Sequence, residues 1–211
     1  MTINRLPKLG QWILFLTLSY FHLPQACAGD YRLLVGFGFG GSGISQENTD
    51  NPSIGTVKRS EGPGVATLGL EKILSDHVTL SFDHSRGFRL GPFSSGLAFT
   101  GFSGRYYLGS IPWGSKEAKG EPTLFIKRPH AYVGLGAGVA QGTIIREGDI
   151  VPTVTASGIY VGFRGGADIP LNSHGFGIRP ELMMSGSFAS SKPNPSKLTL
   201  VSLGCQVYFQ L

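Results

Sequence analysis

The chain has little charge, little cysteine and no long apolar run, and each shortage excludes a class of protein. Charged residues are 15% of its 211 residues, below the ~25% of soluble domains. With 41% hydrophobic residues, the chain is nevertheless too apolar for an intrinsically disordered protein. Two cysteines cannot build a disulfide framework or a cysteine-rich zinc site. No apolar run reaches the ~20 residues that a membrane-spanning helix needs.

Glycine is the residue that the chain has in excess. There are 32 glycines in 211 residues, about twice the usual share of roughly 7%, and they show no Gly-X-Y period, which excludes collagen. The net charge is +5, but lysine and arginine form no cluster, so we expect no nucleic-acid partner. The length suits one domain, or two small ones at most.

The N-terminus has the order of features found in a secretory signal peptide. Arg5 and Lys8 give a positive start, and an apolar run follows from Trp12 to Phe21. Small residues then precede the mature chain at the positions that a signal peptidase reads. We therefore predict that residues 1–28 are a cleaved signal peptide and that residues 29–211 form one domain.

The predicted cleavage follows Ala28, and Ala26 and Ala28 are the two small recognition residues. Lipidation of Cys27 is the alternative, but Pro24 stands where a lipobox has an aliphatic residue. If cleavage follows Ala28, Cys205 is the one cysteine that remains, and it has no partner for an internal disulfide.

Apolar residues alternate with small or polar ones in eight segments after residue 28. In the first, Leu33, Val35, Phe37 and Phe39 share one face, while glycine occupies much of the other. Such period-2 alternation predicts β-strands, and about ten residues is the length that a tilted strand needs to cross a bilayer. The segments are 31–40, 66–71, 78–83, 98–108, 131–139, 159–169, 176–185 and 201–209.

The connections between these segments alternate in length. Two are short, at 73–76 and 170–173, whereas four are long and polar. In a meander this alternation places all long loops at one end, as in outer-membrane barrels with short periplasmic turns and longer outside loops. The connection 109–129 departs from the pattern, because it should be short. The expected long loops are 41–64, 85–95, 141–152 and 189–196.

The glycine-bearing face also carries four basic and four acidic residues. Inside a narrow barrel, isolated charges would be costly, but paired charges compensate one another. We therefore predict a charge network in the lumen. Its alternative is a set of exposed polar positions on a soluble sheet, as in a periplasmic barrel with inverted faces. The predicted network consists of Arg32, Glu71, Asp83, Arg105, Arg164, Asp168, Arg179 and Glu181.

Three segments resemble the small outer-membrane β-barrel proteins of Gram-negative bacteria, of the OmpA, OmpX and OmpW type. Residues 131–138 read Ala-Tyr-Val-Gly-Leu-Gly-Ala-Gly, like the glycine-alternating strand of that family, and residues 104–108 read Gly-Arg-Tyr-Tyr-Leu, like its arginine-tyrosine strand ends. Residues 202–209 fit the C-terminal family pattern polar-x-Gly-x-x-hydrophobic-x-aromatic, through Ser202, Gly204, Val207 and Phe209. The chain continues past this pattern with two further residues.

The resemblance implies an all-β fold, an eight-stranded antiparallel up-and-down transmembrane β-barrel in the bacterial outer membrane. It implies contact with outer-membrane lipid and lipopolysaccharide. It also implies that the barrel assembly machinery reads the C-terminal pattern. Since eight strands enclose a space that side chains can fill, we expect no wide aqueous pore.

The sequence contains few residues in arrangements that suit catalysis or metal binding. Asp83, His84 and Ser85 are adjacent, but neighbours in a strand point to opposite faces and cannot form a triad. The His-x-Ser arrangement of barrels that trim lipid A is absent from the sequence. Glu47 and 50–51 could hold calcium weakly, but a solvated loop explains them as well. We predict no catalytic residue, no metal and no cofactor.

Three functions follow as hypotheses. The leading one is a non-enzymatic outer-membrane protein whose four polar loops contact an external ligand, in adhesion or envelope integrity. The second is a narrow channel for small apolar or amphiphilic solutes, which the OmpW resemblance allows and the small residues Gly134, Gly136 and Gly138 favour. The third, a lipid-modifying barrel enzyme, lacks a catalytic set.

Overall fold

The computed structural model of the chain describes residues 30–47, 56–62, 64–88, 93–111, 128–146, 154–188 and 196–211. Their regular structure is all β-strand. No helix in this part of the chain is long and apolar enough to cross a membrane. The strands are β1 (Tyr31–Glu47), β2 (Thr56–Glu61), β3 (Gly64–Ile73), β4 (Val78–Phe88), β5 (Phe93–Ser95), β6 (Ala98–Tyr107), β7 (His130–Arg146), β8 (Val154–Pro170), β9 (Phe176–Ser187) and β10 (Ser196–Gln210).

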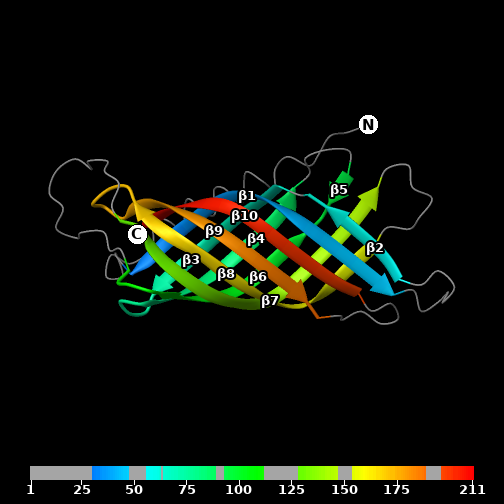
Figure 1. The fold of residues 1–211 in the computed structure, drawn as a ribbon, viewed down its shortest axis with the longest axis horizontal. Coiled ribbons are helices and arrows are strands. Elements are labelled where there is room, and N and C mark those ends of the chain that lie inside the picture. Colours follow the sequence, from blue (N-terminus) through cyan, green and yellow to red (C-terminus); the bar gives the residue numbers. More distant parts are fainter. Residues whose placement is uncertain are drawn as a thin grey trace, which may run out of the picture.

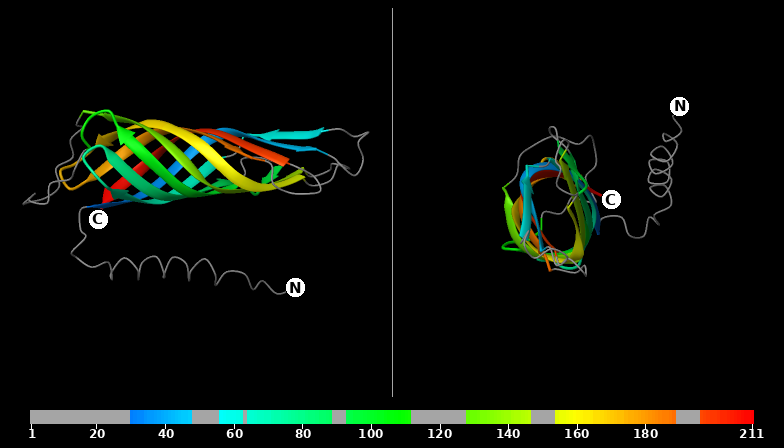
Figure 2. Two further views of the ribbon diagram at one scale, coloured as in Figure 1. Left: turned by 90° about the horizontal axis from the view of Figure 1, so that it is seen from below. Right: turned by 90° about the vertical axis from the view of Figure 1, so that its right-hand side faces the viewer.

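Eight staves, meaning the eight long strands that form the wall together with any short strand that extends them, close into an antiparallel barrel (Figures 1 and 2). They follow the order β10-β9-β8-β7-β6-β4-β3-β1, and pairing of β1 with β10 closes the ring. The short β2 pairs with β1 just beyond β3, and β5 pairs with β7 just beyond β6, so each extends an existing stave. Staves consecutive in the chain are neighbours in the barrel, which confirms the predicted eight-stranded up-and-down fold.

The turns and the longer connections lie at opposite ends, as the connection lengths predict. The short turns fall at 74–77 and 171–175. In the second turn Gly175 has a φ of 83°, a left-handed conformation that glycine adopts without a steric penalty. The β6–β7 connection at the same end starts with an ordered stretch, in which the Ile111 backbone N–H donates to the carbonyl of Asp76 over 2.8 Å.

Several strands extend further toward the loop end than predicted. β1 runs to Glu47, β4 to Phe88 and β7 to Arg146, although the expected loops begin at 41, 85 and 141. The outward residues of β1 there are Gly41, Gly43 and Ser45 rather than large apolar side chains. Beyond the bilayer the outer wall meets water, so along β1 the apolar alternation disappears while the backbone pairing continues.

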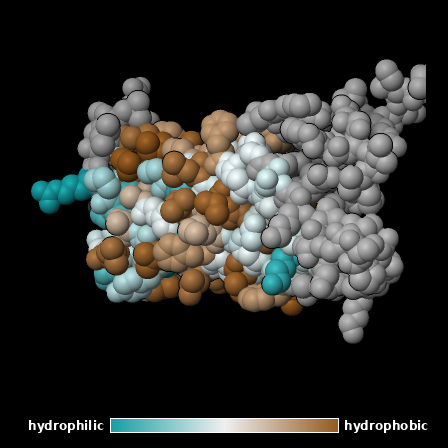
Figure 3. Space-filling view, turned by 45° about the vertical axis from the view of Figure 1, so that its right-hand side comes forward, coloured by the Kyte–Doolittle hydropathy of each residue, from teal (hydrophilic) through white to brown (hydrophobic). Residues whose placement is uncertain are grey.

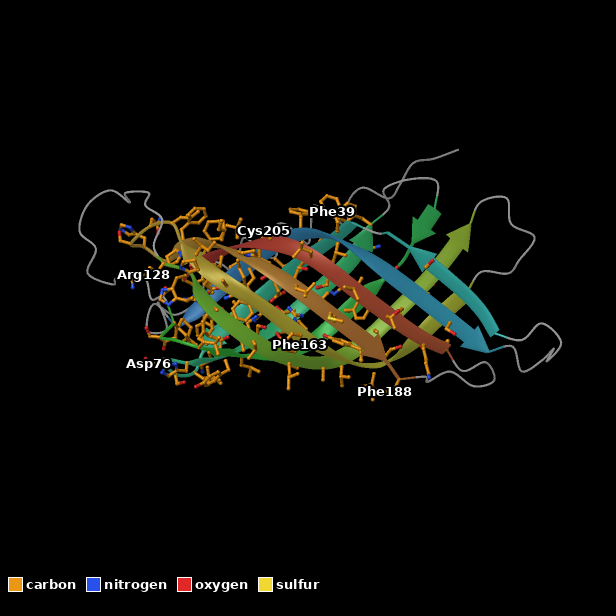
Figure 4. All side chains as sticks on the ribbon, in the orientation of Figure 1. Phe39, Asp76, Arg128, Phe163, Phe188 and Cys205 are labelled. Carbon is orange, nitrogen blue, oxygen red and sulfur yellow. The ribbon has the colours of Figure 1, made fainter. Side chains whose placement is uncertain are left out.

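The outer wall of the barrel is apolar along its middle (Figure 3). Phe37, Phe39 and Leu135 are 66%, 69% and 72% exposed, and Phe39 and Phe188 lie on the outer side of the wall in Figure 4. From Ala131 to Val139, nine residues at about 3.3 Å each, tilted by ~40°, cover roughly 20–25 Å, the height of an outer-membrane apolar band. This band is the lipid-facing surface of an outer-membrane barrel, and the inverted soluble barrel is wrong for this part of the chain.

The inner glycines make room for large side chains of neighbouring strands. On β6, Gly101 faces Gly138 of β7. A Cβ atom on Gly101 would lie 2.7 Å from the Gly138 Cα and 2.8 Å from the Tyr160 hydroxyl oxygen. Tyr132 fills the space over Gly166 in the same way. The small face of the strands is therefore the complement of a filled interior.

We predict that Gly101→Ala lowers the free energy of unfolding by about 1–3 kcal/mol, because the added methyl group overpacks the barrel wall. Guanidinium unfolding of the barrel in lipid vesicles measures this change. Gly104→Ala, on the same strand, is the matched control, since the nearest atom to its new Cβ is 3.9 Å away. Equal stability of the two variants would contradict the explanation.

Candidate functional site

The barrel interior has two main layers of different chemistry, and a small apolar cluster of Ile73, Tyr107, Ile111 and Tyr132 lies at the turn end. The layer nearer the short turns contains the charged side chains, and the layer nearer the loops is apolar. All eight predicted charged residues point into the lumen and are buried, with exposed fractions between 0% and 6%. The structure therefore brings together the residues that the sequence assigned to one face of separate strands.

Arg179 lies at the centre of the charged layer. Its Nε donates to Asp168 Oδ1 over 2.6 Å and its Nη2 donates to Glu71 Oε2 over 2.8 Å. Arg32 Nη1 donates to the other oxygen of Asp168, also over 2.8 Å. These four residues come from β1, β3, β8 and β9, so the contacts cross-link the lumen rather than neighbouring strands alone.

A second group adjoins the first on the side of the loops. Arg164 lies 3.3 Å from both Asp83 Oδ2 and Glu181 Oε1. Arg105 joins the two groups, because its Nη1 donates to Glu71 over 3.0 Å while its Nη2 lies 3.4 Å from Glu181. Each carboxylate thus lies near at least two arginines, the arrangement that offsets the cost of removing charges from water.

Neutral side chains add further hydrogen bonds to the carboxylates, although Asp83 Oδ1 accepts none from the described residues. The hydroxyl groups of Tyr107 and Tyr132 donate to Asp168 and Glu181 over 2.7 and 2.8 Å. The guanidinium of Arg179 also lies over the Tyr132 ring, 5.3 Å from its centroid, a favourable cation–π arrangement. Further donors to the acidic groups are Thr79, Ser81, Ser103 and Gln206.

The apolar layer was not predicted from the sequence. Phe99 packs edge-on against Tyr160, with ring centroids 5.3 Å apart, and both are nearly inaccessible to solvent. In β10 the inward Leu198 and Leu200 come just before the lipid-facing Val201, so the apolar face changes sides at this point. This shift of the apolar residues from odd to even positions is the sequence feature from which the layer could have been predicted. The layer consists of Ile44, Val65, Leu97, Phe99, Ala140, Tyr160, Met183, Leu198 and Leu200.

A small cavity lies between the two layers. Its volume is about 20 Å³, and Thr67, Glu181, Ser202 and Gln206 are among its lining residues. That space holds about one water molecule. Side chains therefore fill the described interior in two successive layers.

The other predicted residues are placed as follows. Ser202 faces the lumen and Phe209 faces outward at the turn end of β10, while Gly204 lies opposite Gly38 of β1 across the closing seam. Val207 is half-buried on the outer face. The cleavage-site residues at 26 and 28 lie outside the described residues, as do the side chains at 47, 50 and 51. The roles assigned to all of these residues remain predictions.

The wall of the barrel separates the adjacent residues that could suggest a catalytic triad. Asp83 and Ser85 face the lumen, whereas His84 faces outward. His84 Nδ1 instead lies 2.8 Å from Thr100 Oγ1 on the outer surface of β6. Among the described residues, no group of three or more His, Cys, Asp and Glu side chains is arranged to hold a metal ion.

We predict that Arg179→Met lowers the free energy of unfolding by about 3–5 kcal/mol, because it leaves Glu71 and Asp168 without their central partner in a buried site. Urea unfolding in lipid vesicles measures the effect. Arg86→Met is the matched control, since Arg86 is an exposed outward residue and surface substitutions stay within about 0.5 kcal/mol. A loss below 1 kcal/mol for Arg179→Met would show that the charged layer does not stabilise the barrel.

Known structures of similar shape were found by comparison. Neisserial surface protein A has a TM-score of 0.49 and 10% identity, over 85% of this chain and 97% of that one. The N-terminal β-barrel domain of Pseudomonas aeruginosa OprF gives 0.46 and 12%, over 86% and 99%. Ail, the attachment invasion locus protein of Yersinia pestis, solved with the heparin analogue sucrose octasulfate, gives 0.44 and 11%, over 85% and 99%.

No family model and no curated protein sequence matches the chain. Because all three TM-scores are below 0.5, the assignment of the fold rests on the strand pairing of this chain itself. That pairing and the apolar outer wall describe an eight-stranded outer-membrane barrel with a filled interior.

Proposed function

We propose that this chain is a non-enzymatic, non-conducting outer-membrane barrel that presents four loops on the bacterial surface for contact with an external ligand. The single observation that carries the proposal is the filled interior. A charged layer and an apolar layer follow one another along the lumen, and each is built from buried side chains.

The position of the apolar layer supports a role in holding the loop end rigid. Its nine residues come from seven of the eight staves, with β4 as the exception. They lie toward the loop end of the barrel, where the strands lead into residues 48–55, 89–92, 147–153 and 189–195. A barrel that is packed at this level fixes the ends of its loops, as expected of a scaffold for surface contacts.

The same filling counts against the narrow channel for apolar or amphiphilic solutes. Side chains of neighbouring strands fill the space beside the glycines that favoured a channel, such as Gly134 and Gly136. A Cβ atom added to Gly134 would lie 3.1 Å from Arg105 Cγ, and one added to Gly136 would lie 3.2 Å from Ser103 Cβ. A solute would have to displace both layers to pass.

Planar-bilayer recording tests the non-conducting part of the proposal. The purified barrel, checked for folding by its heat-dependent gel mobility, should show no stepwise conductance, because both layers exclude a continuous water path. A general porin inserted under the same conditions is the positive control. Stable single-channel steps, or uptake of small amphiphiles into barrel-containing liposomes, would favour the channel instead.

Loop replacement tests the surface role. Cells in which residues 48–55 are replaced by a Gly/Ser linker of equal length should lose adhesion to the surface that the parent strain binds. Barrel folding and detergent resistance should be unchanged, because the strands and both lumen layers are intact. Replacing 171–175, a turn at the opposite end, is the control. If deleting the whole gene changes neither adhesion nor envelope integrity, the proposal is wrong.

A further inference from the structure

The first residues of the β6–β7 connection cover the turn-end mouth of the lumen. This connection is longer than a turn at that end should be, and residues 108–111 stay hydrogen-bonded to the barrel. The backbone N–H of Leu108 donates to the carbonyl of Ala131 over 3.0 Å, and that of Ile111 donates to the carbonyl of Asp76 over 2.8 Å. Asp76 lies in the β3–β4 turn, at the end of the barrel where Figure 4 labels it. The segment 108–111 therefore connects β7 with the β3–β4 turn.

Ile111 is the residue that closes the mouth. Its side chain is buried and packs with Ile73, Tyr107 and Tyr132, which point inward from β3, β6 and β7. The centroids of the two tyrosine rings lie 5.4 Å apart, and their hydroxyl groups donate to carboxylates of the charged layer. This cluster therefore shields the charged layer from water on the turn side, as the apolar layer does on the loop side.

Two histidines hold this segment from opposite sides of β6. His77, which directly precedes β4, has its Nδ1 3.0 Å from the carbonyl oxygen of Gly109. His130, the first residue of β7, has its Nδ1 2.7 Å from the carbonyl oxygen of Ser110. Because a carbonyl oxygen can only accept, Nδ1 carries the hydrogen and donates it in each contact. β4 and β7 are the two neighbours of β6, so the segment is held on both sides.

These histidine contacts face water, unlike the contacts of the charged layer. Both are exposed, and Ile111 is the one buried side chain of the segment 108–111. A segment held by exposed hydrogen bonds and few buried side chains opens at low cost. The short turns of an outer-membrane barrel face the periplasm. We propose that residues 108–111 form a latch on the periplasmic mouth, held shut by His77 and His130, and that its opening admits water to the charged layer.

Labelling of a buried cysteine tests the latch in the folded, detergent-solubilised barrel. Ile111→Cys places a reporter under the latch, and Ser110→Cys, at an exposed position, gives the rate of an accessible thiol. A charged maleimide, followed by peptide mass spectrometry, should label the reporter much more slowly than this reference. Replacing both His77 and His130 by alanine should speed labelling of the reporter about tenfold, the effect of two lost hydrogen bonds. Heat-dependent gel mobility checks that each variant is folded.

Two control variants separate the latch from general effects of losing a histidine. His77→Asn combined with His130→Asn should keep labelling slow, because an asparagine amide can donate in place of Nδ1. His174→Ala should also keep it slow, because His174 lies in the β8–β9 turn, where its Nδ1 contacts Ser173. If the asparagine variant labels as fast as the alanine variant, the histidines do not hold the latch and the proposal is wrong.

Hydrogen exchange of the barrel without the reporter cysteine gives a second measurement. The backbone amides of 108–111 should exchange about tenfold faster when both histidines are alanine, whereas those of the turn 171–175 should not change. Unchanged exchange at 108–111 would overturn the proposal, as would a reporter that labels as fast as Ser110→Cys while both histidines are present. Neither measurement involves conductance or the loops, so the latch and the proposed surface role fail separately.

Discussion

Each strand of this barrel passes from lipid into water, and the face that must be apolar therefore changes along its length. Within the bilayer the outer wall meets hydrocarbon and must be apolar, since unsatisfied polar groups there are costly. Beyond the bilayer the wall meets water, and the interior becomes the place for apolar side chains. In β10, Leu203 and Val201 face lipid, whereas Leu200 and Leu198 face inward. On β10 the inner apolar layer begins at this change, whereas on β8 and β9 apolar side chains such as Ile159 and Met184 also lie on the outer face at the level of that layer.

The charged layer follows from the narrowness of eight strands. Side chains on the inner face cannot avoid one another, so their charges must balance over a few ångströms. Arginine suits this task because its planar guanidinium contacts several carboxylates at once, as Arg179 contacts Glu71 and Asp168. Glycines on neighbouring strands provide the volume that these long side chains need, as Gly134 does beside Arg105. Glycine excess and paired charges are therefore two aspects of one packing arrangement.

Alternation in the sequence was enough to predict the number of strands, their faces and the inward direction of all eight charges. It could not predict which charges meet, because alternation shows which face of the strand a side chain lies on but not its position along the barrel axis. Arg32 and Asp168 are 136 residues apart, and only the register and closure of the barrel bring them together. The apolar layer was missed for a different reason. Phe99 and Leu198 lie on the inward positions of their strands, whereas the apolar residues that identified each strand lie on the outward positions. A pattern that assigns the apolar residues of a strand to one face therefore stops where they move to the other face.

A closed interior limits where such a protein can recognise other molecules. Opening the lumen would separate buried ions from their partners, at about 3–5 kcal/mol for each broken pair, and would also expose the apolar layer. The outer wall carries no such constraint, since its side chains point away from the packed interior. On the proposed surface role, the interior supplies rigidity, and contacts with other molecules fall to the outer wall and the loops.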